Sequence, residues 1–152
     1  MNKMALIILI VLSVAGIGMI ALGLVWMRGG EYKKAEVIIG ENKFEVEVAD
    51  DMVKRSRGLS GREELGEKEG MLFVYEIAGS PGFWMKEMNF PIDIIWIKNG
   101  KVLGFEEKMT PESYKEKKIF YPPEKIKMIL EVRAGIVEKL NIKEGEEIII
   151  NW

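Results

Sequence analysis

The sequence Pro-Ile-Asp-Ile-Ile-Trp-Ile-Lys-Asn-Gly-Lys-Val-Leu-Gly-Phe-Glu, residues 91–106, predicts a β-hairpin. Two largely apolar runs, 92–98 and 102–106, flank the dipeptide Asn99-Gly100. A type I′ turn needs positive φ at both of its central residues, and Asn-Gly is a pair that tolerates this conformation well. We therefore expect two antiparallel strands joined at Asn99-Gly100.

The same period of two continues on both sides of this hairpin. Glu45 and Glu47 alternate with apolar residues, which is the pattern of a half-buried strand. A second hairpin is expected around Gly40, and the remaining apolar runs predict further strands. The additional strands are expected at residues 35–39, 43–49, 71–75, 82–86, 127–132 and 147–151.

Helix signals are limited to two short segments. Asp50 or Asp51 can cap a helix that runs to Arg57 and ends at Gly58, and residues 134–140 can form another. Many short strands with few helices are typical of a mainly β fold. We expect a compact small barrel or sandwich with one or two short helices.

The N-terminal segment differs from the rest of the chain. Residues 4–27 contain no charged side chain, and about 20 apolar residues are enough for a helix to cross a bilayer. The run is longer than that of a cleaved signal peptide and ends in Trp26-Met27-Arg28. The sequence therefore predicts one N-terminal transmembrane helix within an anchor and linker of residues 1–34, followed by a soluble β domain of residues 35–152.

Composition excludes several classes of site. The chain has no Cys and no His, so it cannot form a thiolate nucleophile, a Ser-His-Asp triad or an ordinary zinc or haem site by itself. We expect no cofactor and no metal. Residues 35–152 carry 18 basic and 23 acidic side chains, a balance of −5, which argues against nucleic-acid binding. Abundant Glu and Lys are typical of proteins from hyperthermophiles.

Six motifs in a fixed order give the soluble part a family resemblance. They are Arg55–Leu59 with Arg62, Gly70–Tyr75, Phe83–Lys86, Pro91–Ile94, Leu130–Val132 with Ala134-Gly135, and Leu140–Gly145. Residues 36–150 resemble domain-of-unknown-function family 192. The resemblance implies a small, mainly β domain carried behind an export or anchor segment, and it implies no established reaction.

Two consequences follow from the resemblance. The distribution of basic residues around the span slightly favours a cytoplasmic domain, whereas the resemblance implies an extracytoplasmic one, and we adopt the latter. The family usually has Asn after the Phe-Trp-Met-Lys run, but this chain has Glu87. An acceptor-only carboxylate there replaces a side chain that also donates.

Three charged residues interrupt strands that are otherwise apolar, namely Lys86, Asp93 and Glu131. A buried and unpaired charge costs several kcal/mol, so these groups must face water, one another or a polar pocket. Arg62, or alternatively Arg55, can join them, and Trp84 can form an apolar wall. The candidate binding residues are Arg62, Trp84, Lys86, Asp93 and Glu131; no residue is assigned a catalytic role.

Three interpretations of this group remain open. It can be a structural network of ion pairs in a protein-interaction domain, or a pocket for a ligand. It can also be the site of a hydrolase or transferase that uses Asp93, Glu131 and Lys86 as acid, base and anion-holding groups. We favour a binding or accessory module anchored in the cell membrane through residues 4–27, with an unknown small ligand or protein as partner.

Overall fold

The computed structural model describes residues 31–152. In this part of the chain the alternating sequence forms seven strands. The strands are β1 (Lys33–Ile39), β2 (Asn42–Ala49), β3 (Glu69–Gly79), β4 (Ile92–Lys98), β5 (Lys101–Met109), β6 (Ile126–Arg133) and β7 (Ile148–Asn151). They make one sheet in the order β5-β4-β6-β3-β2-β1-β7. All neighbours are antiparallel except the parallel pair β2 and β3.

Both predicted hairpins are confirmed. β4 and β5 meet at Asn99-Gly100, where φ is 52° and 71°, as a type I′ turn requires. β1 and β2 pair down to Ile39 and Asn42 around Gly40. Strand β1 begins at Lys33, so its first residues fall within the segment that we expected to be linker.

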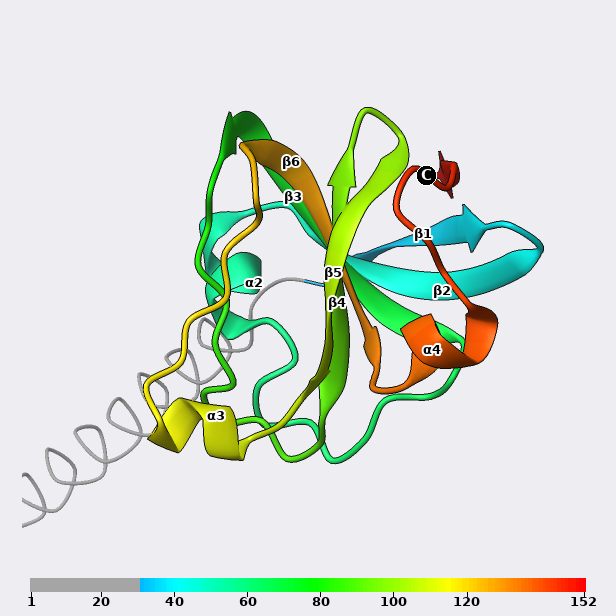
Figure 1. The fold of residues 1–152 in the computed structure, drawn as a ribbon. Coiled ribbons are helices and arrows are strands. Elements are labelled where there is room, and N and C mark those ends of the chain that lie inside the picture. Colours follow the sequence, from blue (N-terminus) through cyan, green and yellow to red (C-terminus); the bar gives the residue numbers. More distant parts are fainter. Residues whose placement is uncertain (1–30) are drawn as a thin grey trace, which may run out of the picture. The chain divides into compact units, whose positions relative to one another are not determined.

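The sheet curls into a half-barrel (Figure 1). Its two edge strands approach each other at one end, where Lys101 forms a bridge with Glu147. Around this bridge the amide of Val102 donates to the carbonyl of Glu146 at 2.9 Å, and that of Ile148 donates to the carbonyl of Gly100 at 2.7 Å. The mainly β expectation is confirmed, and a single curled sheet takes the place of the barrel or sandwich that we considered.

Two hydrophobic clusters lie on opposite faces of this sheet. The first contains side chains from all seven strands, together with Ile136 and Val137 of helix α4 (Ile136–Leu140), and it therefore fills the interior of the half-barrel. The second lies on the outer face of β3, β4 and β6 and is covered by irregular segments. Because β4 and large parts of β3 and β6 are buried on both faces, their sequences are almost continuously apolar there.

The expected strand at 82–86 is wrong. This segment makes one isolated bridge, between Phe83 and Phe120, and otherwise covers the outer face of the sheet, where Phe83 and Met85 are both buried. Phe83 and Met85 lie on the same side of the segment and are buried against the sheet. The segment therefore shows the alternation of a strand although it forms no hydrogen-bonded ladder. Figure 1 shows the segment running beside the chain that follows helix α3 (Glu112–Lys115).

Two of the three short helices were predicted. Helix α2 (Met52–Arg57) is capped by Asp51, whose carboxylate accepts a hydrogen bond from the amide of Lys54 at 2.8 Å, and it ends at Gly58. Helix α4 corresponds to the segment expected at 134–140. Helix α3 was not predicted; it is a single turn without a side-chain cap hydrogen bond.

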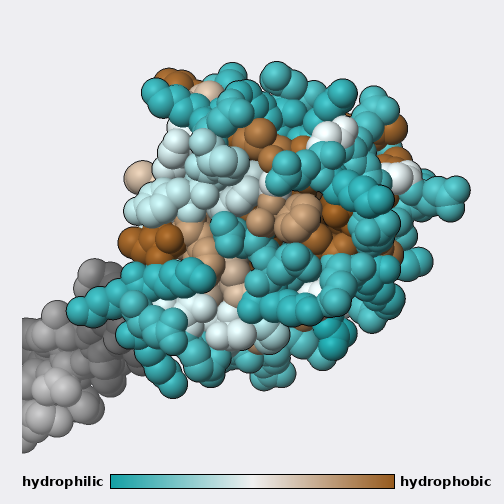
Figure 2. All heavy atoms as spheres, viewed as in Figure 1, coloured by the Kyte–Doolittle hydropathy of each residue, from teal (hydrophilic) through white to brown (hydrophobic). Residues whose placement is uncertain are grey.

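The predicted transmembrane segment, residues 4–27, lies outside the described residues. Within 31–152 no helix is long and apolar enough to cross a membrane. Figure 2 shows that the visible face of this part is mostly hydrophilic, with hydrophobic patches between hydrophilic side chains.

Asp93 is a buried structural group of the interior face. Its side chain is fully buried, and its two oxygens accept hydrogen bonds from the amides of Lys108 at 2.7 Å and Val137 at 2.9 Å. Lys108 has a φ of 51°, so this carboxylate stabilises an unfavourable turn in β5 and also ties the start of α4 to the sheet. Two backbone amides therefore satisfy the carboxylate of Asp93, which we expected to lie in a binding site.

We predict that Asp93→Asn destabilises the domain by about 2 kcal/mol, because the amide group of Asn turns a donor toward one of the two backbone donors. Thermal and chemical unfolding of the variant measure this change. Ligand binding by the fraction that remains folded should be unaltered. Loss of binding without loss of stability would place Asp93 in the binding site after all.

Candidate functional site

A cavity of about 250 Å³ lies between α2 and the outer face of the sheet; we call it the α2 cavity. Four parts of the chain form its wall: α2 with the turn that follows it, β3, the covering segment at 82–88, and β6. Its polar lining residues are Arg55, Ser56, Arg57, Ser60, Tyr75 and Glu131, and its aromatic ones include Phe73, Phe83 and Trp84. Four of the six resembling motifs thus meet at this cavity, namely Arg55–Leu59, Gly70–Tyr75, Phe83–Lys86 and Leu130–Val132.

Gly58 allows the chain to turn sharply over the sheet at this point. Its φ is 51°, and a β-carbon at this position would lie 3.3 Å from Cζ of Phe73. Any other residue would be strained in this conformation and crowded against the ring. The glycine therefore ends α2 and brings its last turn down onto β3, where the cavity forms.

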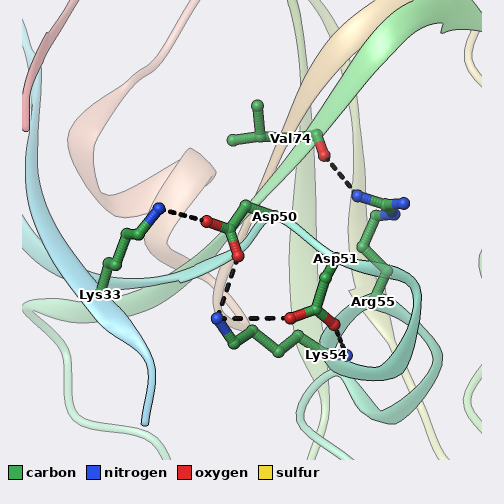
Figure 3. Close-up of polar contacts among 6 residues, drawn as sticks. All are labelled: Lys33, Asp50, Asp51, Lys54, Arg55 and Val74. Carbon is green, nitrogen blue, oxygen red and sulfur yellow. Dashed lines mark hydrogen bonds and ion pairs between the residues drawn. The ribbon is translucent and has the colours of Figure 1, made fainter. Parts of the chain in front are cut away.

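A cluster of charges fixes α2 in place (Figure 3). The Lys54 side chain is 9% exposed, and its ammonium lies 3.0 Å from Asp50 and 3.4 Å from Asp51, while that of Lys33 in β1 lies 2.8 Å from Asp50. The hydrogen bonds from Lys33 and Lys54 lower the pKa of Asp50 to about 2. A six-residue helix is not stable alone, so these contacts position the arginines on it.

Arg55 is held against β3. Its Nη1 donates to the carbonyl of Val74 at 2.8 Å (Figure 3), next to the point where the register of β3 and β6 shifts. Its guanidinium carbon lies 4.7 Å from the centre of the Tyr75 ring. A guanidinium has five N–H donors, so the anchored group retains donors for a ligand in the cavity.

Glu131 reaches the cavity from the sheet. Its residue is 6% exposed, and no group within residues 31–152 hydrogen-bonds to its carboxyl or pairs with it. No fully buried side-chain nitrogen or oxygen lacks a partner in this part of the chain, so the carboxyl oxygens are open to the cavity. Burial raises the pKa of this carboxyl to about 8, and the charge of Arg62 only partly opposes the shift. At neutral pH the group is therefore mainly the neutral acid, which can both donate and accept a hydrogen bond.

Tyr75 shows that these groups converge. Burial raises the pKa of its hydroxyl, the charge of Arg55 lowers it, and the carboxyl of Glu131 raises it further. Both side chains thus act electrostatically on one phenol. The α2 cavity brings a fixed cation, a buried acid and a phenol together beside aromatic walls.

The structure separates the five predicted binding residues. Trp84 and Glu131 line the α2 cavity, and Trp84 is half exposed at its rim. Arg62 does not line it, since its guanidinium forms an ion pair with Glu47, with Nη1 at 3.2 Å from Oε1. This pair lies beside a neighbouring pocket that includes Tyr32.

Lys86 and Asp93 also lie elsewhere. Lys86 is exposed and sits 3.6 Å from Glu87, and only its backbone contributes near the cavity, by accepting a hydrogen bond from the hydroxyl of Ser60 at 2.9 Å. Asp93 pairs with Val132, whereas Glu131 pairs with Ile94. The two acids therefore point to opposite faces of the sheet, and the expected meeting of Asp93 with Glu131 does not occur.

The position of Glu87 is explained by its backbone. Its φ is 56°, and its carbonyl accepts a hydrogen bond from the amide of Gly61 at 2.8 Å. Asn adopts positive φ more readily than other residues that have side chains. The Asn usual at this position thus suits the turn, and a glutamate there preserves the turn at some cost in strain.

No metal site is evident in the part of the chain that the structure covers, because no three carboxylates converge there. The polar groups of the α2 cavity are two arginines, two serines, a tyrosine and one glutamic acid. This set offers mostly hydrogen-bond donors. It is suited to an organic ligand that carries acceptors.

The family model of DUF192, described as “Uncharacterized ACR”, matches residues 35–150. The chain belongs to the DUF192 family. The match spans all but the outermost residues of the half-barrel and includes the four motifs at the α2 cavity. A search of curated proteins finds no match.

Two crystal structures resemble this DUF192 domain. One is a “putative transcription regulator” from Sinorhizobium meliloti 1021, with 28% identity and a TM-score of 0.71 over 79% of this chain and 97% of that one. The other is a protein of unknown function from Novosphingobium aromaticivorans DSM 12444, with 25% identity and a TM-score of 0.69 over 78% of this chain and 84% of that one. Almost all of the Sinorhizobium chain is covered by the match, so in that protein the domain folds without an N-terminal extension.

Sequence reasoning missed most of the α2 cavity of this DUF192 protein. Arg55 was considered only as an alternative to Arg62, and Arg57 and Tyr75 were not considered. The available signal was the run Arg55-Ser56-Arg57-Gly58, in which charged residues stand at the end of a short helix before a glycine. Such a run places donors at a turn, but the sequence does not show which strand the turn faces.

We predict that Glu131→Gln stabilises the domain at alkaline pH. Below pH 4.5, the ordinary pKa, the carboxyl is protonated in both the folded and the unfolded chain. Between 4.5 and about 8 the unfolded chain ionises while the folded chain keeps its proton, so stability falls as the pH rises and then levels off. The variant lacks this loss, and its advantage should grow to a few kcal/mol by pH 8.

Chemical denaturation at pH 5 and pH 8 measures the difference. Glu47→Gln is the matched control, since it changes an acid that is already paired with Arg62 and should destabilise the domain. A pH-independent effect of Glu131→Gln would show that Glu131 ionises normally when folded.

Proposed function

We propose that this protein is a binding module that takes up a small organic anion with an apolar body in the α2 cavity, and that a membrane anchor holds it outside the cytoplasm. The observation that carries the proposal is the carboxyl of Glu131, which lines the cavity from a residue that is only 6% exposed and accepts no hydrogen bond from the described chain. Its oxygens are open to the cavity, because no fully buried side-chain nitrogen or oxygen among the described residues lacks a partner. A ligand oxygen in the cavity would take the place of water beside this acid.

The charges of the cavity support an anionic ligand. Arg55 and Arg57 line it and are both positive, whereas Glu131 is mainly neutral at pH 7 because of its raised pKa. Guanidinium groups bind carboxylates and phosphates through paired N–H donors. A carboxylate or phosphate near the arginines would leave the apolar part of the ligand against Trp84 and Phe83.

The shape of the cavity also supports a binding role. Cavities that hold small ligands are mostly apolar with a few polar groups that converge, and the α2 cavity combines three aromatic walls with such groups. Its volume, about 250 Å³, suits a molecule with one or two rings. The unidentified ligand is thus a compact one.

The anchor and the orientation complete the proposal. The uncharged residues 4–27 are long enough to span a bilayer. The DUF192 resemblance implies a domain behind an export or anchor segment. The description of the Sinorhizobium protein as a transcription regulator is not extended to this chain, since a balance of −5 in residues 35–152 opposes contact with a phosphate backbone.

A second candidate function is that of a hydrolase or transferase. It is favoured by Glu131 alone, because a carboxyl that stays protonated near neutral pH can act as a general acid. Asp93 and Lys86 no longer belong to this candidate, since neither lines the cavity. Such an enzyme would lose activity as the pH rises through about 8, whereas a binding module would show no turnover.

We predict that ligand charge controls binding to the α2 cavity. Three probes share one ring system and differ in charge: indole-3-acetate, indole-3-acetamide and tryptamine. The acetate should raise the melting temperature of the 31–152 domain most and tryptamine least, because the arginines favour an anion. Calorimetric titration gives the affinities.

Two variants test where the acetate binds. Arg57→Gln should weaken it roughly tenfold, the usual cost of one charge-assisted hydrogen bond. Lys86→Gln is the control, since this exposed side chain does not line the cavity and its loss should leave affinity unchanged. Equal binding of all three probes, or equal loss in both variants, would contradict the proposed site.

For the orientation, we predict that a protease added to intact cells that express the full chain removes the domain. The readout is an immunoblot with an antibody against residues 31–152, and a cytoplasmic marker protein serves as control for lysis. Complete protection of the domain, with cleavage after permeabilisation, would reverse the orientation.

A further inference from the structure

A second hollow lies around helix α3, on the other side of Trp84. It has a volume of about 320 Å³ and is lined by Trp84, Tyr114, Lys115, Lys117, Lys118 and Ile119; we call it the α3 surface. Trp84 is 50% exposed, and Tyr114 and Ile119 are each 45% exposed. Large aromatic and aliphatic groups are thus in contact with solvent beside three lysines.

The lysines of the α3 surface have no carboxylate partner within residues 31–152, although seven other lysines in that range form ion pairs with acids. Lys118 instead lies 4.5 Å from the centre of the Phe120 ring. Segment 114–119 contains three lysines and one glutamate, so it is positive on a domain that is otherwise acidic.

The local backbone fixes these side chains outward. Lys117 has a φ of 57°, and the amides of Lys117 and Lys118 donate to the carbonyls of Tyr114 and Ser113, each at 3.0 Å. This is the hydrogen-bonded end of a helix at which glycine is the usual residue. A lysine here keeps a charged side chain at a position where glycine would be favoured.

The covering segment holds the α3 surface rigidly. Phe83 and Phe120 exchange two backbone hydrogen bonds, each of 2.8 Å. A β-carbon on Gly82 would lie 2.8 Å from Ile119 and 2.9 Å from Tyr121, so the two segments can approach only because residue 82 is glycine. The aromatic groups are therefore positioned before any partner arrives.

We propose that the α3 surface rests on the headgroup region of a membrane that carries anionic lipids. Tyr and Trp are enriched at this depth of a bilayer, and lysines extend from apolar surface to lipid phosphates. The positive charge of segment 114–119 is complementary to such a surface.

Chain length supports the same occupant. This step rests on the membrane anchor of the proposed function. The predicted span ends at Met27 and the domain begins at Tyr32, and the four residues between them extend at most about 14 Å. The domain is therefore kept at the bilayer, and the face that combines unpaired lysines with exposed aromatic groups is the one suited to lie on it.

Vesicle binding by the 31–152 fragment, which lacks the anchor, tests the α3 surface by itself. The fragment carries Trp152→Phe, because Trp84 is then its only exposed tryptophan, Trp96 being 1% exposed. We expect the fragment to sediment with vesicles that contain phosphatidylglycerol, with a blue shift of tryptophan emission. Vesicles of phosphatidylcholine alone should give neither result, and added salt should weaken the binding.

Matched triple variants locate the contact. Replacement of Lys115, Lys117 and Lys118 by Gln should reduce partitioning roughly a hundredfold, in line with the usual contribution of each lysine near an anionic surface. The control replaces Lys101, Lys127 and Lys143 by Gln, three exposed lysines on other elements, and should change partitioning little.

Several outcomes would overturn this proposal. They are equal loss in the two triple variants, a blue shift without phosphatidylglycerol dependence, and no vesicle binding by a folded fragment. Self-association of the fragment that the first triple variant abolishes, without vesicle binding, would assign the surface to a second copy instead. Fractionation of the full chain tests the anchor separately, since a chain that fails to pellet with membranes contradicts the anchor and leaves the vesicle result unaffected.

Discussion

β4 pairs with β6 so that Asp93 lies opposite Val132 and Ile94 lies opposite Glu131. This register places two acids from adjacent strands on opposite faces of a sheet that is buried on both sides. The interior acid receives two backbone donors and ties α4 to the sheet. The outer acid receives none from the described chain and lies at a cavity. A shift of one residue in the pairing of β4 with β6 would place both acids on the same face.

The cavity depends on contacts made well away from it. Lys54 holds α2 between two aspartates, and Gly58 lets the chain turn over Phe73. Arg55 then fastens the same turn to β3 through the carbonyl of Val74. The interior of the half-barrel provides the stability, while this small outer layer carries the polar groups that a ligand would meet.

Local patterns in the sequence were sufficient for most of the fold, because they reflect local physics. The Asn99-Gly100 turn and the cap at Asp51 follow from the conformations and hydrogen bonds of a few adjacent residues. The residues that form the site were harder to predict. Alternation assigns a side chain to one face of its own strand, but it does not give the register between that strand and the neighbouring strand. Asp93 and Glu131 could therefore be grouped by sequence although the sheet separates them. The predicted strand at 82–86 is wrong for a related reason. Alternate residues that are buried against the outer face of the sheet give the same sequence pattern as alternate residues of a hydrogen-bonded strand.

Trp84 belongs to the wall of two hollows at once, the α2 cavity and the α3 surface. An indole that turns to accommodate an occupant on one side alters the space on the other. If both occupants are sensitive to its rotamer, their binding free energies are coupled, and the coupling is the same in either direction. A single exposed side chain would then make the affinity for a soluble anion depend on whether the domain is resting on lipid.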